Sequence, residues 1–495
     1  MSSATIAGCF RDKTILITGG TGFLGKMVVE KILRVQPDVK QLYLMVRAPN
    51  NASAKKRVLT EVIGKDLFNV LGEEHGANFD NFIDTKITPI AGDIIYEDFG
   101  CDKSEIAKLA EEIDIIINGA AITNFYERYD VALATNTLGV KYLLQFAKNC
   151  ANLKMLLHIS TAYVAGPRKG LLLEEPLKMG ATLKQGLTLD ISTETKLIEK
   201  LKSDLHSAKR SPHSEKIAMK ELGLKRARHF GWPNTYVFTK AMGEMLLDNL
   251  GADLPVVIAR PSIVLSTIED PMPGWIEGVR TTDAFIVGYA DQTIPCFALD
   301  DKSIIDTIPG DMVINAMLVA MATQYNKKSQ VIYHISAATE NPLEGNTIVE
   351  WTYRYFSIYP HTTHKGTNQK KRVLMFNKYK HFLAYTFLVY RLPIEVLHMV
   401  NLFPFKLFSC HYNKLKRKYD RFLRLAKFYA PYSFNKGYFD VTNLKKLRTA
   451  ARKDYCDAYM FNFDPKCINW GSFLFNIHIP AVIKHALEKK TGTST

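Results

Sequence analysis

A chain of 495 residues is too long for one compact core, and its length therefore predicts two domains. Hydrophobic residues make up 47% of it and charged residues 23%, a balance that excludes extensive disorder. The formal net charge of +15 favours an anionic partner, and seven scattered cysteines without metal-ligand spacing favour reduced thiols inside a cell.

The N-terminus, residues 1–13, has no charged segment followed by an apolar run, so we expect no secretory signal. It is also short and poor in arginine, which weakens a mitochondrial or plastid address. The sequence therefore predicts an intracellular protein and disfavours a plastid location.

Through about residue 260, short β-branched runs alternate with helical patterns. This alternation predicts an α/β fold with a doubly wound parallel sheet, whose strands are continuously apolar because helices cover both faces. The runs that predict the strands are residues 14–18, 42–46, 87–91, 114–118, 155–160 and 256–260.

A glycine-rich turn, TGGTGFLG at residues 18–25, joins the first predicted strand to an amphipathic helix that ends before Pro37. Its G-x-G-x-x-G spacing permits a tight turn and lets backbone amides approach a pyrophosphate, which the helix N-terminus favours. The residues expected to contact such a dinucleotide cofactor are Gly19, Thr21, Gly22, Phe23, Leu24 and Gly25.

Three later strand ends add to this cofactor site. The second strand is followed by Arg47, where an NAD-selective site would offer an acid to the ribose 2′-hydroxyl, and an arginine suits a 2′-phosphate instead. NADPH is therefore the predicted cofactor. Asp93, after the third strand, is expected to bond the adenine amino group. Asn118 ends the fourth strand and begins the small-residue run NGAA, which allows the cofactor close passage.

The predicted catalytic residues are Tyr236 and Lys240, which share one helix face at i and i+4. A tyrosine is a poor proton donor at neutral pH unless its anion is stabilised, and an adjacent ammonium does this. A hydroxyl at the end of the fifth strand, Thr161 or Ser160, is expected to hold the reacting carbonyl oxygen. We favour Thr161 and leave Ser160 open.

Two further residues and one exclusion complete the predicted site. Asn136, in the helix after the fourth strand, is a candidate for fixing a water that relays protons to Lys240. Pro261 directly follows the sixth strand and is expected beside the cofactor. The histidines show no metal-ligand spacing, so we assign no metal.

A long insertion, residues 170–232, interrupts the predicted sheet before Tyr236. It carries helical patterns at 194–205 and 215–228. Loops this long usually carry structure or function, so we expect a helical cap beside the site, with a surface excursion as the alternative.

Beyond Pro342 the strand-helix alternation stops, and the basic stretch 364–372 is expected to be a linker. It would separate a cofactor-binding domain, residues 10–365, from a helical C-terminal domain, residues 373–495. The apolar segment 382–390 is interrupted by polar residues before the roughly 18 apolar residues that a membrane span needs, so we expect no span. An interfacial helix pair and the buried core of a small helical domain both remain open, and the buried core is favoured.

Residues 401–453 contain 14 lysines and arginines but only two acidic residues. Such a block suits an anionic membrane, a phosphate-rich substrate or an acidic protein, or it is a solvated helix face. No nucleic-acid-binding module accompanies it, so we expect no nucleic-acid partner.

Taken together, these residues resemble the fatty acyl-CoA reductase family, the alcohol-forming plant type in particular, over nearly the whole chain. Two C-terminal segments are more specific to this family than the dinucleotide motif. The matching segments are FRDKTILITGGTGFLG (10–25), PGWIEG (273–278), IPGDMV (308–313), FDPKCINW (463–470) and NIHIP (476–480).

The resemblance implies an extended short-chain dehydrogenase/reductase fold of the Rossmann type with a smaller, mainly helical C-terminal domain. It implies reduction of a long-chain acyl-CoA by NADPH, through an aldehyde, to a primary alcohol for wax, cutin or suberin lipids. We expect a protein that is cytoplasmic or peripheral on the endoplasmic reticulum membrane, and a contact between the C-terminal domain and the membrane stays open.

Three alternatives stay open. The substrate is acyl carrier protein rather than acyl-CoA, or the reaction stops at the aldehyde, or the chain is a non-catalytic NADPH-binding sensor. The intact pair of Tyr236 and Lys240 argues against a sensor, which has no need of a proton donor.

Overall fold

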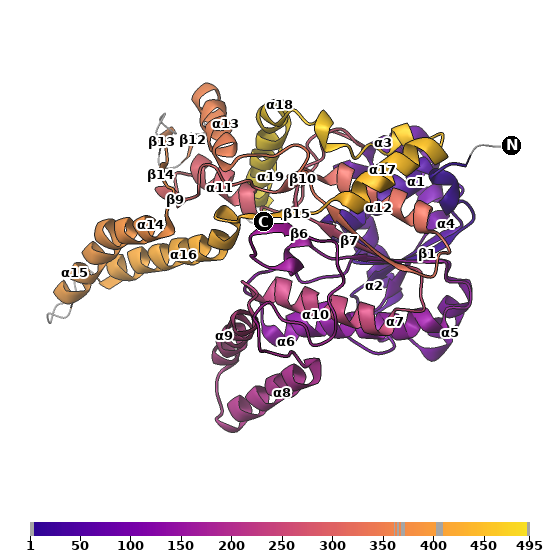
Figure 1. Cartoon of the computed structure of the whole chain (residues 1–495), viewed down its shortest axis with the longest axis horizontal. Helices are drawn as coiled ribbons and strands as arrows, with labels where there is room; N and C mark the ends of the chain where they lie inside the picture. The colour runs from indigo at the N-terminus through magenta and orange to yellow at the C-terminus, as the bar shows by residue number, and fades with distance from the viewer. Residues whose placement is uncertain (1–3, 361, 364–365, 368–371, 402–408, 493–495) are drawn as a thin grey trace.

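A computed structural model describes residues 4–360, 362–363, 366–367, 372–401 and 409–492 of the chain (Figure 1). Its centre is a seven-stranded sheet, entirely parallel, in the order β11-β7-β5-β4-β1-β2-β3. The chain starts in the middle, winds to one edge and then to the other, which confirms the predicted doubly wound α/β fold. The strands are β1 Thr14–Thr18, β2 Gln41–Val46, β3 Ile87–Ala91, β4 Ile115–Asn118, β5 Met155–Ile159, β7 Val256–Pro261 and β11 Gln330–Ile335.

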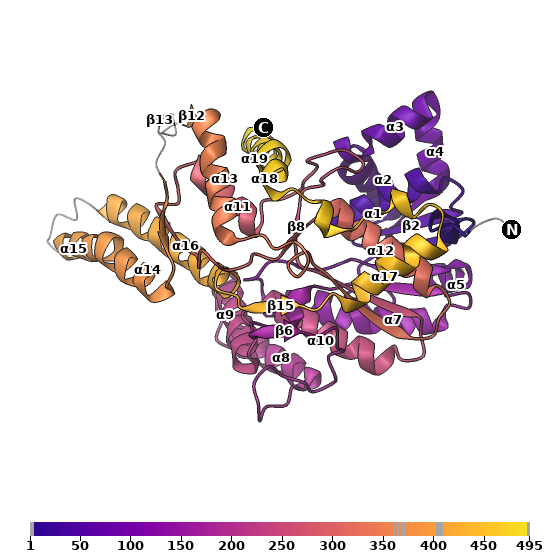
Figure 2. The ribbon, with the colours of Figure 1, turned by 45° about the horizontal axis from the view of Figure 1, so that its top comes forward.

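Helices cover both faces of this sheet, as the continuously apolar strands predict. On β1, Ile15 and Ile17 belong to one core while Leu16 belongs to the other, because successive side chains of a strand point to opposite faces. Helices α1, α12 and α17 pack on the first face, and α5, α7 and α10 on the second (Figure 2). The helices of this body are α1 Phe23–Val35, α2 Asn51–Val58, α3 Asn69–His75, α4 Phe79–Lys86, α5 Lys103–Glu112, α6 Tyr129–Leu133, α7 Gly139–Asn149, α10 Thr235–Leu250, α12 Gly310–Gln324 and α17 Thr442–Asp454.

The insertion contains a short strand, β6 (Gly170–Leu172), and two helices, α8 (Ile191–Ser207) and α9 (Pro212–Phe230). Both predicted helical patterns lie within these helices. The Asp190 carboxylate caps the first, and the Ser211 hydroxyl caps the second just before Pro212. The two helices pack on each other, on α6 and, through α9, on α10. The insertion therefore covers the helix that carries Tyr236.

Between β7 and the C-terminal region the chain forms smaller elements outside the main sheet. Strand β8 pairs with β10, and β9 pairs with β14. These elements are β8 Ile263–Leu265, α11 Thr281–Ala290, β9 Cys296–Ala298, β10 Thr307–Pro309, α13 Gly345–Ile358, β12 Thr362–Thr363, β13 Gly366–Thr367 and β14 Leu374–Phe376. Much of the predicted linker, residues 364–365 and 368–371, lies outside the described residues, as do the predicted domain ends at 365 and 495.

Three helices project from the body and are called the arm here: α14 (Tyr379–Thr386), α15 (Leu392–Val400) and α16 (Ser409–Ser433) (Figure 1). Helical residues 387–391 join the first two into one stretch, Tyr379–Val400. By length and composition alone these 22 residues are sufficient to cross a membrane, a test that we expected them to fail. Most of their side chains are exposed, so the favoured expectation of a buried core is wrong for this segment.

After the arm the chain returns to the body. Strand β15 (Gly437–Phe439) pairs with β6, and α17 packs on β11 and α12. Helices α18 (Trp470–Phe473) and α19 (Ile479–Gly492) follow, and α19 packs on α11. The Asp457 carboxylate accepts hydrogen bonds from the backbone amides of Ile6 at 2.7 Å and Ala7 at 3.0 Å, so the C-terminal region holds the start of the chain.

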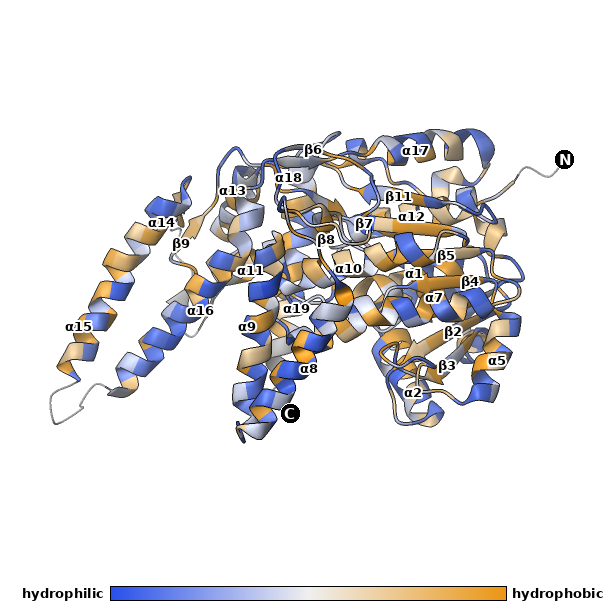
Figure 3. Ribbon diagram, turned by 60° about the horizontal axis from the view of Figure 1, so that its bottom comes forward, coloured by the Kyte–Doolittle hydropathy of each residue, from blue (hydrophilic) through white to orange (hydrophobic). Residues whose placement is uncertain are grey.

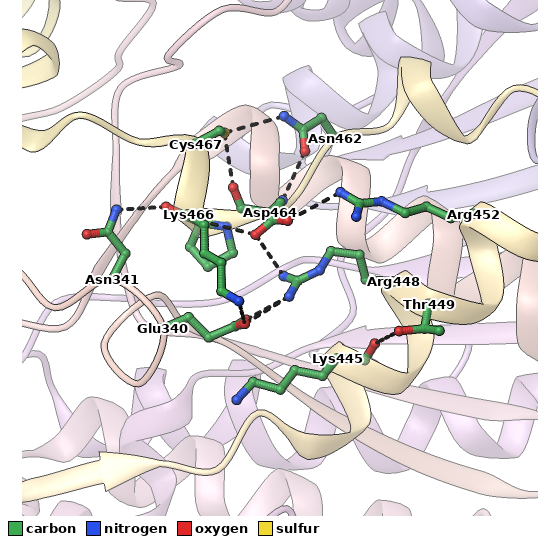
Figure 4. Close-up of polar contacts among 11 residues, drawn as sticks. Glu340, Asn341, Lys445, Arg448, Thr449, Arg452, Asn462, Asp464, Lys466 and Cys467 are labelled. Atoms are coloured by element: carbon green, nitrogen blue, oxygen red, sulfur yellow. Dashed lines mark hydrogen bonds and ion pairs between the residues drawn. The ribbon is translucent and has the colours of Figure 1, made fainter.

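The basic block divides between two environments. In α17, Arg448 pairs with Glu340 at 2.9 Å and with Asp464 at 3.3 Å, and Arg452 also reaches Asp464 (Figure 4). In α16, by contrast, the basic side chains are exposed, and Figure 3 shows this helix as mostly hydrophilic beside α14 and α15. Lys406 lies outside the described residues. The α16 part of the block is therefore a candidate anion-binding surface, and in α17 Lys445, Lys446 and Lys453 are exposed as well.

Candidate active site

Tyr236 and Lys240 lie in the first turns of α10, which begins after Asn234, whose side chain caps the helix by accepting from the Val237 amide at 3.1 Å. The Lys240 side chain is 1% exposed, and its Nζ donates to the Ile159 carbonyl at 2.8 Å. Burial lowers the pKa of Lys240 to about 8, although the charge of Glu244 opposes this shift. The ammonium is therefore close to losing its proton under mildly alkaline conditions.

Around Tyr236 the groups present act on its pKa in opposite directions. Burial raises the pKa of the phenol to about 12, while the charge of Arg280 and a hydrogen bond from Thr161 lower it. Phe125 stacks on the ring with centroids 6.1 Å apart. Arg280 was not predicted, because an isolated arginine in a loop some forty residues further along carries no signal in the sequence.

The two candidate hydroxyls point to different partners. Thr161 is hydrogen-bonded to Tyr236, and its Oγ1 lies 3.4 Å from the carbonyl oxygen of Pro261. The Ser160 hydroxyl instead donates to Glu244, which also forms a buried ion pair with Arg260. The structure thus brings Thr161 and Pro261 to the predicted catalytic tyrosine, and turns Ser160 toward the Glu244 carboxylate.

The carboxamide of Asn136 is occupied by protein groups. Its Oδ1 accepts from the Ile122 amide at 2.8 Å, and its Nδ2 donates to the Ile122 carbonyl at 3.0 Å and to the Thr239 hydroxyl at 2.9 Å. Both amide hydrogens are used, so this side chain fixes the loop after β4 against α10. Oδ1 accepts one hydrogen bond here and has a second acceptor site, so the water relay stays a prediction.

The glycine turn has the close backbone packing that a dinucleotide site needs. Gly19 has φ +73°, and a Cβ added there would lie 2.5 Å from the Ala120 amide nitrogen. A Cβ on Gly25 would lie 2.2 Å from the Gly19 carbonyl oxygen. Helix α1 begins at Phe23 with no acidic residue in its first turn, so its free amides are open to an anion. These residues fit a bound pyrophosphate.

A segment from far along the chain folds over this turn. Trp275 stacks on Phe23 at 5.2 Å and 10°, and the Arg280 guanidinium lies 5.5 Å from the Phe23 ring centroid. Arg280 thus lies near both the expected pyrophosphate position and Tyr236. The segment PGWIEG, matched in the sequence only as a family pattern, therefore packs against the glycine turn through Trp275.

The remaining predicted cofactor residues lie along the same edge of the sheet. Arg47 is exposed, and within the described residues its guanidinium has no protein partner. Asp93 lies two residues after the end of β3, at the start of a turn, and accepts from the Ile95 amide at 3.2 Å. Asn118 is buried and accepts from Thr18 at 2.8 Å.

A chain of buried polar groups links Asn118 to the catalytic lysine. Asn118 Nδ2 lies 3.0 Å from His158 Nδ1, and His158 Nε2 lies 3.1 Å from Lys240 Nζ. Burial and the Lys240 charge keep the pKa of His158 far below its usual value, so the imidazole is neutral and one ring nitrogen accepts. No sequence pattern singled out His158, because its contact with Lys240 depends on how β5 and α10 are placed.

The foot of the arm reaches the site. Tyr432, near the end of α16, accepts a hydrogen bond from Asn234 Nδ2 at 3.0 Å. Its ring stacks on Phe125 at 5.5 Å and meets Tyr163 edge-on at 4.8 Å. No sequence pattern had connected this tyrosine with Tyr236, nearly two hundred residues earlier.

The comparisons with known proteins agree with one another. Residues 17–317 match an NAD-binding family described as male sterility protein, and residues 389–489 match a second family with the same description. The chain is 44% identical to the alcohol-forming fatty acyl-CoA reductase of Simmondsia chinensis, over 96% of this chain and 97% of the relative. It is 43% identical to fatty acyl-CoA reductase 1 of Arabidopsis thaliana, over 97% and 98%.

Solved structures share the fold at low sequence identity. The terminal R domain from the myxalamid PKS-NRPS biosynthetic pathway superposes with a TM-score of 0.54 at 17% identity, over 97% of this chain and 92% of that one. The reductase domain of a nonribosomal peptide synthetase from Mycobacterium tuberculosis gives a TM-score of 0.54 at 16% identity, over 96% and 91%.

Proposed function

The chain belongs to the fatty acyl-CoA reductases of the male sterility protein family, and on that premise we propose that it converts long-chain acyl-CoA into primary fatty alcohol with NADPH as reductant. The observation that carries the proposal is the conjunction of Tyr236, Lys240 and Thr161 in a chain so similar to alcohol-forming reductases along its whole length. The reaction is a four-electron reduction that passes through the aldehyde and releases coenzyme A.

In this proposal NADPH, when bound, supplies one hydride to each of two successive carbonyl groups. Thr161 donates a hydrogen bond to the thioester oxygen, and Tyr236 is the proton donor to the oxygen that becomes negative. Lys240 stabilises the resulting phenolate by its charge, and Arg280 adds a second cation. As the C–S bond breaks and the thiolate leaves, the hydroxyl of the hemithioacetal returns its proton to the Tyr236 phenolate and becomes the aldehyde carbonyl. Tyr236 is thereby restored and protonates the aldehyde oxygen in the second reduction. Asn136 acts as a positioning residue for α10.

The deciding experiment is NADPH oxidation by the purified protein with long-chain acyl-CoA, followed by extraction of the lipids. We expect two NADPH consumed for each primary alcohol formed. Aldehyde at one NADPH would retain the site and overturn the alcohol-forming reaction. No oxidation with any acyl-CoA, despite NADPH binding, would overturn the proposed substrate.

The preference for NADPH over NADH rests on Arg47, whose exposed guanidinium is free to bind a 2′-phosphate. Arg47→Ala should raise the KM for NADPH roughly tenfold or more, the effect of losing a hydrogen bond to a charged group, and leave the KM for NADH almost unchanged. Lys55→Ala, which removes a nearby exposed cation paired with Asp84, is the matched control. Equal effects on both coenzymes would contradict the assignment.

For localisation, we propose that the arm lies on an anionic membrane surface, which keeps the protein peripheral inside the cell. The stretch Tyr379–Val400 exposes Leu388 at 61%, Val396 at 54% and Met399 at 66%. Helix α16, which packs against α15, exposes basic side chains alongside. An apolar face next to lysines and arginines is the pattern of an interfacial helix pair, and the exposed Arg391–Glu395 pair disfavours full insertion.

Vesicle sedimentation tests the membrane contact. The protein should bind vesicles that contain anionic phospholipid, and bind less as salt is raised. Leu388→Asp combined with Met399→Asp should remove binding, whereas Ile358→Asp, equally exposed at 62% but outside the arm, should not. Vesicle binding that both variants retain would contradict the proposal.

A further inference from the structure

The segment NIHIP, residues 476–480, spans the start of α19, which packs on α11 (Figure 1). Its histidine, His478, is fully buried. A polar ring is costly to bury unless its nitrogens have partners, so the groups that face the two nitrogens indicate what this residue does.

The two ring nitrogens of His478 face different elements. Nδ1 lies 3.4 Å from the backbone nitrogen of Ser266, directly after β8, and 3.1 Å from the Ser266 hydroxyl. Because the backbone amide can only donate, Nδ1 accepts and the ring proton is on Nε2. Nε2 lies 3.2 Å from a carboxylate oxygen of Asp283, which is also buried, in the first turn of α11. The imidazole therefore joins the end of β8 to the start of α11.

The Asp283 carboxylate in turn fixes the backbone at Arg280. Its other oxygen accepts from the Arg280 amide at 3.0 Å, and the Arg280 carbonyl accepts from the Asp283 amide at 2.7 Å. The next residue, Thr281, has φ +30°, a conformation that a β-branched residue keeps only where its surroundings hold it. The contact between His478 and Asp283 is part of that hold, because it orients the carboxylate that binds the Arg280 amide.

Arg280 is the residue of this arrangement that reaches the active site. Its guanidinium lies 5.5 Å from the ring centroid of Phe23 at the glycine turn. Burial raises the pKa of Tyr236 to about 12, and the Arg280 charge opposes this rise. The effect of a charge falls with distance, so a displaced Arg280 backbone would weaken the influence of its guanidinium on Tyr236.

The residues before Arg280 are held from two sides as well. We call residues 273–283 the cover loop. On the side of α1, Glu277 forms an ion pair with the buried Lys26 at 2.6 Å. On the side of α19, the Gly278 amide donates to His485 Nε2 at 2.9 Å. Two histidines of the C-terminal region therefore contact the cover loop, and His478 is the one that reaches Arg280 through a single residue.

We propose that His478 is a positioning residue of the active site and that it acts through Asp283 on Arg280. The Arg280 guanidinium is thereby kept beside Tyr236 and the glycine turn, so the C-terminal region completes the site of a reductase whose catalytic residues lie in the first half of the chain. The inference rests on the proposed function, because NADPH-dependent reduction is the activity that Arg280 serves.

Two amide substitutions separate the two contacts of the ring. His478→Asn places an oxygen near the Nδ1 position, so it can still accept from Ser266, but it is too short to reach Asp283. His478→Gln places an amide N–H near the Nε2 position and keeps a donor for Asp283. We expect His478→Asn to lower kcat by roughly 10–10² and to weaken NADPH binding about tenfold, and His478→Gln to recover most of both losses.

A double-mutant cycle with Arg280→Ala gives a readout that a merely structural role would not move. If His478 acts through Arg280, His478→Asn should lower neither kcat nor NADPH affinity further in the Arg280→Ala background. Ile479→Val is the matched control, because it shortens the neighbouring buried side chain of the same segment. It should lower the thermal midpoint and leave kcat and NADPH affinity unchanged.

Asp283→Asn breaks the same contact from its other side and carries the cycle if His478→Asn does not fold. Its carboxamide has one acceptor oxygen, which cannot serve both the Arg280 amide and His478. We expect the losses of kcat and NADPH affinity that His478→Asn gives, and again none beyond those of Arg280→Ala.

Losses in His478→Asn that disappear in the Arg280→Ala background support the proposal. Losses that multiply with those of Arg280→Ala, equal losses in the Asn and Gln variants, or no loss in His478→Asn would overturn it and leave the proposed function intact. Fluorescence titration measures NADPH affinity without a second substrate, so the cycle can be completed on binding alone. Wild-type protein that binds NADPH but reduces no acyl-CoA would overturn the proposed function instead.

Discussion

Lys240 is held by protein groups on two sides before any substrate is present, by the Ile159 carbonyl and by the His158 imidazole. The spacing of Tyr236 and Lys240 could be predicted from the sequence, because i and i+4 share a helix face wherever the helix lies. His158 and Arg280 could not, because their closeness to the pair depends on how β5 and the loop before α11 are placed. For the same reason the sequence left Ser160 and Thr161 open, since adjacent residues at a strand end point in different directions.

The state of Lys240 predicts a pH dependence. Its pKa is lowered to about 8, so the ammonium is present below that pH and lost above it. We therefore expect kcat/KM to fall as pH rises through about 8, since the neutral amine no longer stabilises the Tyr236 phenolate. In Lys240→Arg, whose guanidinium stays charged, any residual activity should lack this fall. If kcat/KM of Lys240→Arg also fell as pH rose through about 8, the titrating group would be a residue other than Lys240.

Three single substitutions separate the hydroxyls of the site. Tyr236→Phe should lower kcat by roughly 10²–10⁴, the usual effect of losing a general acid, with NADPH affinity retained. Thr161→Val should lower kcat by roughly 10² through loss of an oxyanion hydrogen bond. Ser160→Ala should chiefly cost about 1 kcal/mol of stability, because its partner is Glu244. Steady-state kinetics and thermal melts measure both effects, and a kcat loss in Ser160→Ala larger than in Thr161→Val would reverse the assignment.

At the scale of elements, all six predicted strands of the sheet are found, each within one residue of its expected ends. Buried parallel strands are continuous apolar runs, and this signal is local. The seventh strand, β11, was not predicted, because the small elements between β7 and β11 break the strand-helix alternation. The arm was predicted as helical, but its exposure was not, since an apolar helix has the same composition in a core and on a surface.

The glycine turn allows a prediction with an internal control. Gly25→Ala should weaken NADPH binding at least tenfold, because the new Cβ would lie 2.2 Å from the Gly19 carbonyl oxygen and the backbone must move. Gly20→Ala should have little effect, since its Cβ would meet the Leu44 side chain at 3.5 Å and the Ile17 side chain at 3.9 Å, both ordinary contact distances. Fluorescence titration with NADPH measures both affinities. If Gly25→Ala and Gly20→Ala lost NADPH affinity equally, NADPH binding would not depend on the close approach of Gly25 to the Gly19 carbonyl.

At the scale of the whole molecule, the chain's first and last segments stabilise each other. Asp457→Ala removes the acceptor of the Ile6 and Ala7 amides and should lower the free energy of unfolding by about 2 kcal/mol. Asp454→Ala, at an exposed position three residues earlier, should change it by less than about 0.5 kcal/mol. Urea unfolding followed by circular dichroism measures the free energy of unfolding of each variant. Equal unfolding midpoints for Asp457→Ala and Asp454→Ala would contradict a stabilising contribution from the Asp457 hydrogen bonds.

The return of the chain after the arm has a consequence for its biosynthesis. A ribosome releases the glycine turn first, while Tyr432, β15 and Asp457 all emerge much later. A nascent chain therefore exposes β6 without its partner strand, and residues 6–7 without their Asp457 contact, for most of its synthesis. A premature stop codon anywhere before β15 would consequently yield a substrate for cellular quality control, and not a shorter reductase of reduced activity.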